Sequence, residues 1–417
     1  MAGLGGPGNM SRIRIATLNT GSSSIKMAAF EPGTGADEPG APVLRAQISG
    51  LPSAPRLSVK AGDEAAAERF RGAADLSDLS AEVLALRLIA ALEAALGGPV
   101  SAVGHRIVQG GPEITGSRRA ATELLDLLDT LSPLAPDHQP HNLSAVRALM
   151  EARPGLLQTL SFDTAFHRTQ PRIAQLYAIP RALSDEGMLR YGYHGLSYAH
   201  VARSLPRLFG ARAHDRTLAL HLGSGASLCA LRGGLSVACS MGFSALSGIP
   251  MGTRSGDVDP GLILFLLRER SMSVEAVSQM LRQESGLLGV SGVSGDLRAV
   301  EASDTDEARE ATDLFAYRIV RECGSMIAAL GGLDALVFTA GIGENAPGIR
   351  ARIAEGLAWT GLRLDAAANA GNALRIDGPE SSVCVAVMPA DEEWEIARGT
   401  LGLIEGIDSI PEQKRQD

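Results

Sequence analysis

The pattern of apolar and polar positions near the start of the chain predicts a hairpin with a small polar tip. Apolar residues alternate loosely with polar ones over 13–18, residues 19–24 are small or polar, and a second apolar run covers 25–30. Such alternation is typical of a half-buried strand, and a Gly/Ser segment between two runs favours a turn. The tip offers hydroxyls, an amide and the ammonium group of Lys26, which suit a phosphate oxygen. Taken alone, such a tip is more often a turn that binds nothing.

Two later stretches repeat this order of strand and small-residue turn. Residues 217–222 and 226–231 are apolar and enclose the turn 223–225, and the strand 336–339 leads into a glycine turn at 341–345. A second hairpin of the same kind predicts a duplicated architecture with one hairpin in each of two lobes, although such repeats also arise by chance. The last glycine pair is a weak indication of nucleotide binding, because no dinucleotide fingerprint surrounds it.

Longer periodic stretches predict helices between the strands. Ser80 is expected to cap a helix over 81–96 that ends at Gly97, and Asn142 is expected to cap the helix that follows it. Other helices are predicted at 260–270, 273–282 and 304–330, from about 197, from 347 and from 391, with strands at 102–108, 156–162 and 383–388. The segment 49–79 has no pattern strong enough for a prediction.

Composition and charge narrow the class of protein. The chain has 417 residues with a formal net charge of −9, so we expect more than one domain and no nucleic-acid partner. The four cysteines are far apart and lack C-x-x-C spacing, which argues against disulfide and zinc frameworks and fits a reducing compartment. Residues 1–12 lack the apolar core of a signal peptide and predict a flexible extension. No apolar run approaches a membrane span, so we expect a cytoplasmic protein.

Ionisable side chains stand where ligands bind in α/β proteins. Arg106 and Asp163 each lie at the end of a predicted strand, and His194 and Arg254 lie in glycine-flanked loops. Each of them alone is as often structural as functional. Neither a G-x-x-x-x-G-K-[ST] motif nor the protein-kinase motifs occur in the chain. Loop arginines, a histidine and strand-end carboxylates suit phosphoryl transfer, which depends on positioning and on charge neutralisation by Arg and Mg²⁺.

Seven motifs in chain order resemble those of the acetate kinase family, with the propionate kinases close to it. They are N-T-G-S-S-S-I-K (19–26), G-H-R-I-V-Q-G-G (104–111), F-D-T-A-F-H (162–167), R-Y-G-Y-H-G (190–195), H-L-G-S-G-A-S (221–227), M-G-T-R-S-G-D (251–257) and G-I-G-E-N (341–345). The resemblance implies an α/β fold of two duplicated actin-like, ribonuclease H-like lobes with the active site in the cleft between them. It implies an N-terminal lobe of 13–163 with 394–417 and a nucleotide-binding lobe of 164–393.

The resemblance also implies an activity and a set of residue roles. It implies reversible in-line transfer of the ATP γ-phosphoryl group to acetate with Mg²⁺, or alternatively Mn²⁺, by a homodimer. The implied catalytic residues are Asp163, His194, Arg254 and Arg106; the implied substrate-binding residues are Arg106 and Val108; the implied metal ligands are Asn19 and Glu392. The implied ATP-binding residues are Ser22, Ser24, Lys26, His221, Leu222, Gly223, Ser224, Gly225, Asp296, Leu297, Arg298, Gly341, Ile342, Gly343, Glu344 and Asn345. We interpret Asp163 as the positioner of a Mg²⁺-bound water, because acetate is already ionised at pH 7 and needs no base.

Some positions depart from the usual pattern of the family. Ser224 stands where Asn is usual, Tyr193 where Phe is usual and Asp137 where Leu is usual, and Ala245 where Pro is common. The change at 224 weakens one phosphate contact, and the others concern the acyl pocket. The alternatives are therefore a propionate or other short-chain carboxylate kinase, or a nucleotide-binding ATPase of the same fold without transfer to a carboxylate. The joint presence of Arg106, His194 and Arg254 favours a carboxylate kinase, because an ATPase needs no carboxylate clamp.

Overall fold

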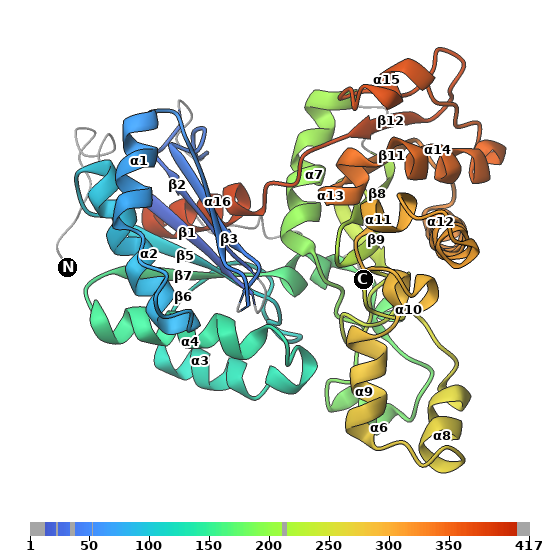
Figure 1. The fold of residues 1–417 in the computed structure, drawn as a ribbon, viewed down its shortest axis with the longest axis horizontal. Coiled ribbons are helices and arrows are strands. Elements are labelled where there is room, and N and C mark those ends of the chain that lie inside the picture. The colour runs from blue at the N-terminus through green and yellow to red at the C-terminus, as the bar shows by residue number, and fades with distance from the viewer. Residues whose placement is uncertain (1–12, 22–23, 34–37, 52, 211–214, 407–417) are drawn as a thin grey trace. The chain divides into compact units, whose positions relative to one another are not determined.

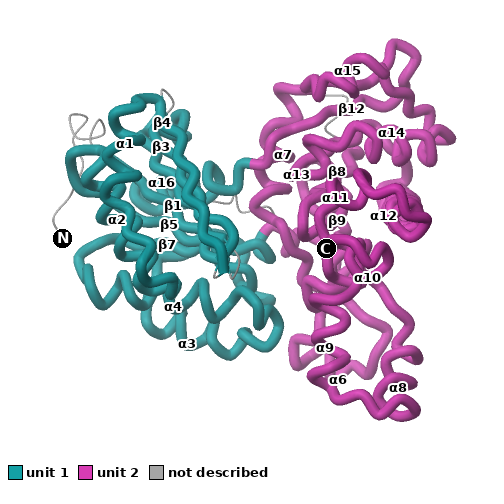
Figure 2. The backbone as a smooth tube through the Cα atoms, viewed as in Figure 1, with its two compact units in different colours: residues 1–165, 391–417 teal, residues 166–390 magenta. Residues whose placement is uncertain are grey.

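The computed structural model of the chain describes residues 13–21, 24–33, 38–51, 53–210 and 215–406, which form two compact units. Unit 1 comprises residues 1–165 and 391–417, and unit 2 comprises residues 166–390 (Figure 2). The sequence analysis drew the lobe boundaries at 163 and 394, so this division moves Glu392 and its neighbours into unit 1. The predicted extension over 1–12 lies outside the described residues.

Within its described residues, unit 1 is built on a seven-stranded sheet in the order β4-β3-β2-β1-β5-β7-β6 (Figure 1). Strands β1 and β2 form the predicted antiparallel hairpin, and β5 and β7 continue the sheet parallel to β1. The strands are β1 (Ile15–Thr20), β2 (Ser24–Phe30), β3 (Leu44–Ser49), β4 (Arg56–Ala61), β5 (Ala102–Ile107), β6 (Arg118–Arg119) and β7 (Leu157–Phe162). Because β1, β5 and β7 are parallel, the residues that follow them meet at one edge of the sheet.

Helices cover both faces of this sheet. They are α1 (Glu64–Ala73), α2 (Ala81–Leu96), α3 (Thr122–Asp129), α4 (Gln139–Ala152) and α16 (Glu392–Glu405). Successive strand residues point to opposite faces, so Leu18 and Met27 pack with α1 and α2, whereas Ile15 and Ala28 pack with α16. The sheet is therefore buried on both sides, which explains why β1 is buried along its whole length.

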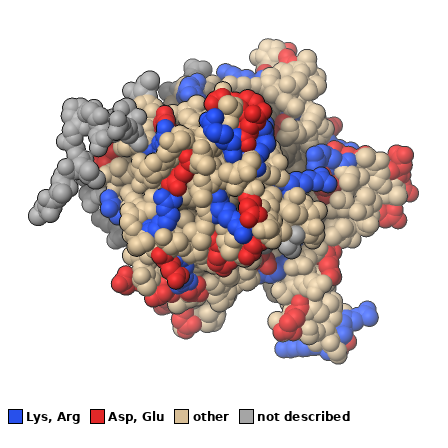
Figure 3. All heavy atoms as spheres, turned by 60° about the vertical axis from the view of Figure 1, so that its left-hand side comes forward, with Lys and Arg blue, Asp and Glu red and all other residues tan. Residues whose placement is uncertain are grey.

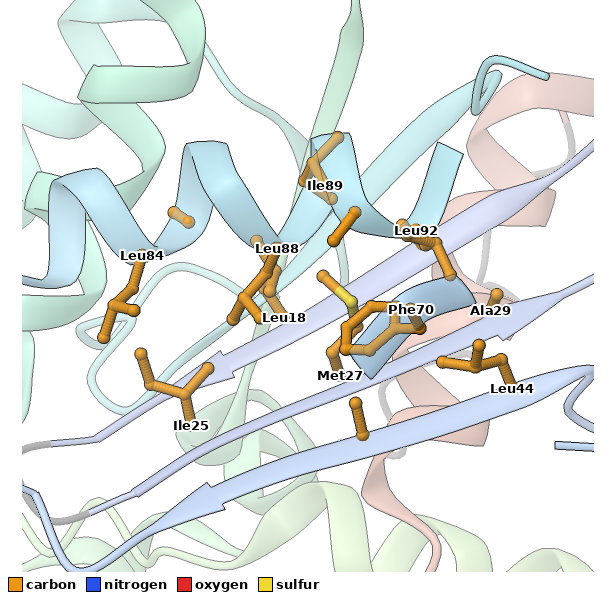
Figure 4. Close-up of a cluster of buried hydrophobic side chains, with 14 of the residues drawn as sticks. Leu18, Ile25, Met27, Ala29, Leu44, Phe70, Leu84, Leu88, Ile89 and Leu92 are labelled. Carbon is orange, nitrogen blue, oxygen red and sulfur yellow. The ribbon is translucent and has the colours of Figure 1, made fainter. Parts of the chain in front are cut away.

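The α2 helix shows why the helical pattern in the sequence was readable. Leu84, Leu88 and Leu92 recur every four residues and point together onto the hairpin strands (Figure 4). The predicted bounds 81–96 are confirmed, and Gly97 ends the helix in the left-handed conformation at φ 66°. Ser80 has the extended backbone of an N-cap, but its side chain makes no capping hydrogen bond.

The described part of unit 2 contains a five-stranded sheet in the order β10-β9-β8-β11-β12. Its strands are β8 (Arg216–Leu222), β9 (Ala226–Arg232), β10 (Leu235–Cys239), β11 (Ala335–Thr339) and β12 (Cys384–Val387). Again an antiparallel hairpin, β8–β9, is extended by strands parallel to its first strand. The predicted second hairpin is confirmed, and the two sheets share the same core topology.

The longer helices of unit 2, of nine or more residues, follow the predicted positions with small shifts at their ends, whereas the shorter ones were not predicted. The helices of this unit are α5 (Arg172–Gln175), α6 (Arg181–Asp185), α7 (Gly195–Phe209), α8 (Pro260–Arg268), α9 (Val274–Gln283), α10 (Gly286–Ser291), α11 (Leu297–Glu301), α12 (Asp306–Leu330), α13 (Ala340–Asn345), α14 (Pro347–Gly356) and α15 (Ala366–Ala370). Helix α7 begins at Gly195 rather than near 197, and α12 begins at Asp306 with Thr305 as its cap.

Two local predictions were wrong. Asn142 does not cap a helix, because α4 already begins at Gln139 and Asn142 lies buried inside its first turns. The expected glycine turn at 341–345 is the short helix α13. In both places buried hydrogen bonds override the local preference for a cap or a turn: Asn142 donates to the carbonyl of Thr20, and Arg350 donates to the carbonyls of Gly343 and Glu344. The segment 49–79, for which no prediction was made, contains β4 and α1.

Charged side chains of both signs are interspersed on the face of the molecule drawn in Figure 3. Several form ion pairs at the surface of unit 1, such as Arg71 with Glu64 and Arg147 with Asp126. Exposed pairs of this kind contribute about 0–1 kcal/mol each, so they bear more on solubility than on stability. None of the helices in the described part of the chain has both the length and the hydropathy of a membrane span.

We predict that Leu88→Ala destabilises unit 1 by about 2–5 kcal/mol, because Leu88 is 2% exposed and its loss leaves a cavity between α2 and the sheet. The matched control is Leu127→Ala on α3, which removes the same atoms from a side chain that is 55% exposed and is expected to cost less than about 0.5 kcal/mol. The measurement is urea unfolding followed by fluorescence of Trp394 in a Trp359→Phe background, which reports on unit 1. Equal losses in the two variants would contradict the prediction.

Candidate functional site

In unit 1 the residues that end the parallel strands form one polar cluster around Arg106. Arg106 donates from Nε and Nη2 to the two carboxylate oxygens of Asp163, at 3.1 and 2.6 Å. Its Nη1 donates to Asn19 Oδ1 at 3.1 Å, and Asn19 Nδ2 donates to Glu392 Oε2 at 3.1 Å. The sequence analysis selected these four residues at widely separated positions, and the fold brings them together.

Burial makes this cluster electrostatically strong. Asp163 is fully buried, and Asn19 and Glu392 are less than one-tenth exposed. Burial alone would lower the pKa of Arg106, but the carboxylates of Asp163 and Glu392 outweigh it and raise the pKa. The guanidinium therefore stays charged, and a double hydrogen bond of this geometry fixes the orientation of both side chains.

The start of α16 places three acidic residues beside the cluster, with different surroundings. Asp391 caps the helix by accepting from the N–H of Trp394, and it pairs with Arg45. Glu393 also pairs with Arg45, at 3.4 Å, but its Oε1 has no hydrogen-bond partner among the described residues. Burial raises the pKa of Glu393. Only Glu392 of the three contacts Asn19 and lies within 4 Å of Arg106.

Two residues of α4, which the sequence analysis did not connect to the site, hold the loop that follows β5. Asn142 accepts a hydrogen bond from the N–H of Val108 and donates one to the carbonyl of Thr20, so it joins the ends of β5 and β1. Gln139 accepts from the N–H of Gln109 at 3.1 Å and donates to its carbonyl at 2.9 Å. Both side chains are buried, and no local sequence pattern distinguishes them from surface amides.

In unit 2 the selected residues His194 and Arg254 lie beside the tip of the β8–β9 hairpin. A Cβ atom on Gly225 would lie 3.4 Å from His194 Nε2 and 3.6 Å from Arg254 Nη1, so this glycine leaves open the space that both groups border. Arg254 Nη1 is oriented by the carbonyl of Ala245 at 3.1 Å. The imidazoles of His194 and His221 are stacked with centroids 4.1 Å apart. Two N–H-bearing side chains around a glycine turn form a suitable environment for an anion.

Other selected residues of unit 2 are distributed over α11 and α13. Asp296 caps α11 and pairs with Arg298 at 2.6 Å, where both side chains are largely exposed. Leu297 is buried, Gly341 and Asn345 are exposed, and Gly343 is buried against Phe338. In unit 1, Lys26 is exposed at the hairpin, Ser24 is half-buried, and Ser22 lies outside the described residues.

Arg350 on α14 is a further residue that the sequence analysis missed. Its side chain is completely buried, and it donates to the carbonyls of Gly343 and Glu344 at the end of α13, at 2.9 and 3.0 Å. The remaining donors reach Asn369 and Asn372. Arg350 therefore fixes the segment that carries the predicted nucleotide-binding glycines.

The positions that depart from the usual family pattern have different environments. Tyr193 is buried, and its hydroxyl donates to the carbonyl of Phe243 at 2.8 Å. Ser224 is exposed at the tip of the β8–β9 hairpin, and Asp137 is half-buried in the turn before α4. The hydroxyl that distinguishes Tyr193 from Phe is thus satisfied within its own unit.

Unit 1 contains oxygen atoms that could bind a hard cation. Among the described residues there is no preformed metal site made of three or more His, Cys, Asp or Glu side chains. Asn19 and Glu392 bring an amide and a carboxylate group together, with Asn19 Nδ2 donating to Glu392 Oε2 and Asn19 Oδ1 accepting from Arg106. Mg²⁺ typically takes one or two protein oxygens and keeps several waters. The donor set therefore fits Mg²⁺.

Two sheets that each extend an antiparallel hairpin with parallel strands define the duplicated actin-like class of α/β protein. Solved structures agree: acetate kinase of Porphyromonas gingivalis is 32% identical with a TM-score of 0.79, covering 94% of this chain and 100% of that chain. A propionate kinase of Francisella tularensis is 30% identical with a TM-score of 0.81, covering 93% and 98%. The chain belongs to the acetokinase family, whose model matches residues 14–398.

Curated relatives cover almost the whole chain as well. Acetate kinase of Methylocella silvestris is 44% identical over 402 residues, which are 95% of this chain and 99% of the relative. Acetate kinase of Rhodopseudomonas palustris (strain TIE-1) is 45% identical over 398 residues, which are 94% and 98% of the two chains. The resemblance found from the motifs is thereby confirmed, including the actin-like fold.

Proposed function

We propose that this protein is an acetate kinase, which catalyses ATP + acetate ⇌ ADP + acetyl phosphate by direct in-line transfer. The observation that carries the proposal is the membership of residues 14–398 in the acetokinase family together with the two clusters around Arg106 and Arg254. The first cluster offers a partly buried guanidinium for a carboxylate, and the second offers donors for a phosphoryl group. An ATPase without a carboxylate acceptor would need only the second.

The direct test is the formation of acetyl phosphate, trapped with hydroxylamine as the acetyl hydroxamate. The purified chain is expected to form it only when ATP, Mg²⁺ and acetate are all present. Release of phosphate from ATP without any acetate requirement, and with no hydroxamate, would instead support the ATPase alternative.

The roles proposed for the charged side chains follow from where charge develops. In phosphoryl transfer the equatorial oxygens of the transferring group carry the charge, so donors fixed before the reaction stabilise the transition state. We assign this role to His194 and Arg254. Arg106 binds the carboxylate of acetate, and Val108, which is buried beside the same loop, contributes to the apolar seat of the methyl group. Asp163 orients a water molecule of the metal rather than acting as a base.

The metal and the nucleotide complete the proposed site. Asn19 and Glu392 would hold Mg²⁺, or Mn²⁺ with the same oxygen ligands, and the ion would neutralise the phosphates of ATP. The residues proposed for ATP are those that the family motifs select: Ser22, Ser24, Lys26, His221, Leu222, Gly223, Ser224, Gly225, Asp296, Leu297, Arg298, Gly341, Ile342, Gly343, Glu344 and Asn345.

We further propose that the enzyme is a cytoplasmic homodimer. The four cysteines, all within the described residues, are free thiols, which suits a reducing compartment. Helix α8 supports self-association, because Leu262, Leu264 and Phe265 are each nearly half exposed on a helix of strongly apolar sequence. Light scattering is expected to give twice the chain mass for the wild type and a lower mass for Phe265→Glu.

We predict that Arg254→Ala lowers kcat by about 10³–10⁵, because an arginine that neutralises the transferring phosphoryl group is worth that much. Nucleotide affinity, measured by titration calorimetry, is expected to change little. Arg106→Ala is expected to raise the KM for acetate as well as to lower turnover. Arg309→Ala, an exposed arginine of α12, is the control. Near-normal turnover of both site variants would contradict the assigned roles.

We predict that Glu392→Gln raises the Mg²⁺ concentration needed for half-maximal activity by at least about tenfold, the lower bound for outer partners of metal ligands. Its fold should survive, because a first-turn acid contributes only about 0.3–1 kcal/mol to its helix. Glu393→Gln makes the same change one residue later and is expected to have a much smaller effect. The reverse order of sensitivity would place the metal at Glu393.

We predict that acetate is the best substrate and propionate a fair second, because one methylene is worth about 1–3 kcal/mol in an apolar pocket and Ala245 leaves room. Asp137 is expected to point away from the substrate, since an ionised carboxylate would repel the acetate carboxylate. The kcat/KM values for acetate, propionate and butyrate should therefore be similar in the wild type and in Asp137→Leu. A large gain for acetate in the Leu variant would show that Asp137 faces the substrate.

A further inference from the structure

His194 lies at the end of a hydrogen-bonded chain that the phosphoryl-transfer roles do not use. Ser227 Oγ lies 2.8 Å from His194 Nδ1 and 2.6 Å from the hydroxyl of Tyr198. Ser227 is completely buried, and Tyr198 is completely buried as well. A buried hydroxyl between a phenol and an imidazole decides which imidazole nitrogen carries the proton.

The fold explains why these three side chains meet. His194 is the N-cap of α7 and Tyr198 lies four residues later, so both project from the same face of the helix. Ser227 on β9 pairs directly with His221 on β8, so both side chains lie on one face of the hairpin. His221 stacks on His194, and its Nδ1 lies 2.9 Å from Ser197 Oγ. Helix and hairpin thus fix the plane of the His194 ring from two sides.

The direction of the hydrogen bonds follows from the chemistry of the donors. Burial raises the pKa of the Tyr198 phenol well above its usual value, so it keeps its proton and is able to donate. A phenol is a stronger donor than an aliphatic hydroxyl, so Tyr198 donates to Ser227. The serine proton is then directed at Nδ1 of His194, which accepts it. The neutral ring consequently carries its own proton on Nε2.

His167, in the same unit, has a similar set of hydrogen bonds, and its partners determine which of its nitrogens carries the proton. His167 Nε2 lies 2.9 Å from the carbonyl of Tyr193, which only accepts, so Nε2 carries the proton. Burial lowers the pKa of His167 to about 3, so the ring is neutral and Nδ1 accepts from Ser236, at 2.8 Å. Ser236 in turn accepts from the amide of Gln170 at 3.0 Å. A donor, a serine and the Nδ1 of a neutral imidazole are thus arranged in the same order.

The consequence concerns the nitrogen that faces the hairpin tip. His194 Nε2 borders the space above Gly225 together with Arg254 Nη1. We infer that Tyr198 and Ser227 are positioning residues that present His194 to the transferring phosphoryl group as the Nε2–H tautomer. This inference rests on the proposed phosphoryl transfer. The opposite tautomer would direct a lone pair at the phosphoryl oxygens and would repel them.

The kinetic test compares variants that differ in one hydroxyl. Tyr198→Phe and Ser227→Ala are expected to lower kcat by about 10–100-fold, as for other partners that orient a functional histidine, with the KM values of ATP and acetate unchanged within about twofold. Ser227→Thr keeps the hydroxyl group, whereas Ser227→Val introduces a side chain of the same shape as Thr without a hydroxyl. The Thr variant is therefore expected to retain far more activity than the Val variant. Tyr191→Phe is the control, because the hydroxyl of Tyr191 donates to the carbonyl of Gly187 and takes no part in the hydrogen bonds between Tyr198, Ser227 and His194. Equal activity of the Thr and Val variants would overturn the inference.

The spectroscopic test reads the tautomer itself. The chain has eight histidines, so selective ¹⁵N labelling gives few signals, and His194→Asn assigns the one of interest. In the wild type a pyrrole-type shift is expected at Nε2 and a pyridine-type shift at Nδ1, and a mixture of tautomers is expected in Ser227→Ala. A wild-type Nδ1–H tautomer would overturn the inference. The nitrogen shifts are measured without turnover, so the tautomer is tested independently of activity. A lack of acetate-dependent phosphoryl transfer would refute the proposed function, whereas the nitrogen shifts alone decide the tautomer.

Discussion

The double hydrogen bond between Arg106 and Asp163 is the constraint on which the site of unit 1 depends. A buried guanidinium is tolerated only where carboxylates and hydrogen-bond acceptors surround it, and here Asp163, Asn19 and Glu392 do so. The strand ends that carry Asn19, Arg106 and Asp163 meet because β1, β5 and β7 are parallel neighbours, and Glu392 is added from the start of α16. Removing Arg106 would leave the fully buried carboxylate of Asp163 without this partner, which typically costs about 3–5 kcal/mol.

The same pair has a consequence for the proposed binding of acetate. The face of Arg106 that would take the carboxylate of acetate is occupied by the carboxylate of Asp163. In the proposed binding, an incoming acetate would therefore compete with Asp163 for these two donors of Arg106. The two assignments, Arg106 as clamp and Asp163 as positioner of water, are thus linked through one hydrogen-bonded pair.

The sequence predicted what local patterns encode. Both hairpins could be predicted because each consists of two apolar runs separated by a turn of small residues. Helix α2 could be predicted because its leucines recur every four residues. Arg106, Asp163, His194 and Arg254 stood out as charged or imidazole groups at strand ends and in glycine loops. The supporting residues did not stand out, because Asn142, Tyr198 and Ser227 acquire their roles from partners 29 or more residues away. Family motifs supplied the remaining roles, since no physical pattern in the chain separates a nucleotide-binding glycine from a turn glycine.

Helix α13 shows that a buried partner from the next helix also changes secondary structure. A helix of six residues is marginal by itself, because it closes few internal hydrogen bonds for the backbone entropy it loses. Two glycines among the six make it weaker still, which is why the sequence predicted a turn. Arg350 reverses the balance by donating to the carbonyls of Gly343 and Glu344 at the end of the helix. Burial lowers the pKa of Arg350, yet a guanidinium remains charged, so these carbonyls face a permanent cation. The glycine backbone proposed to approach the nucleotide is therefore held in place by a side chain that is completely buried.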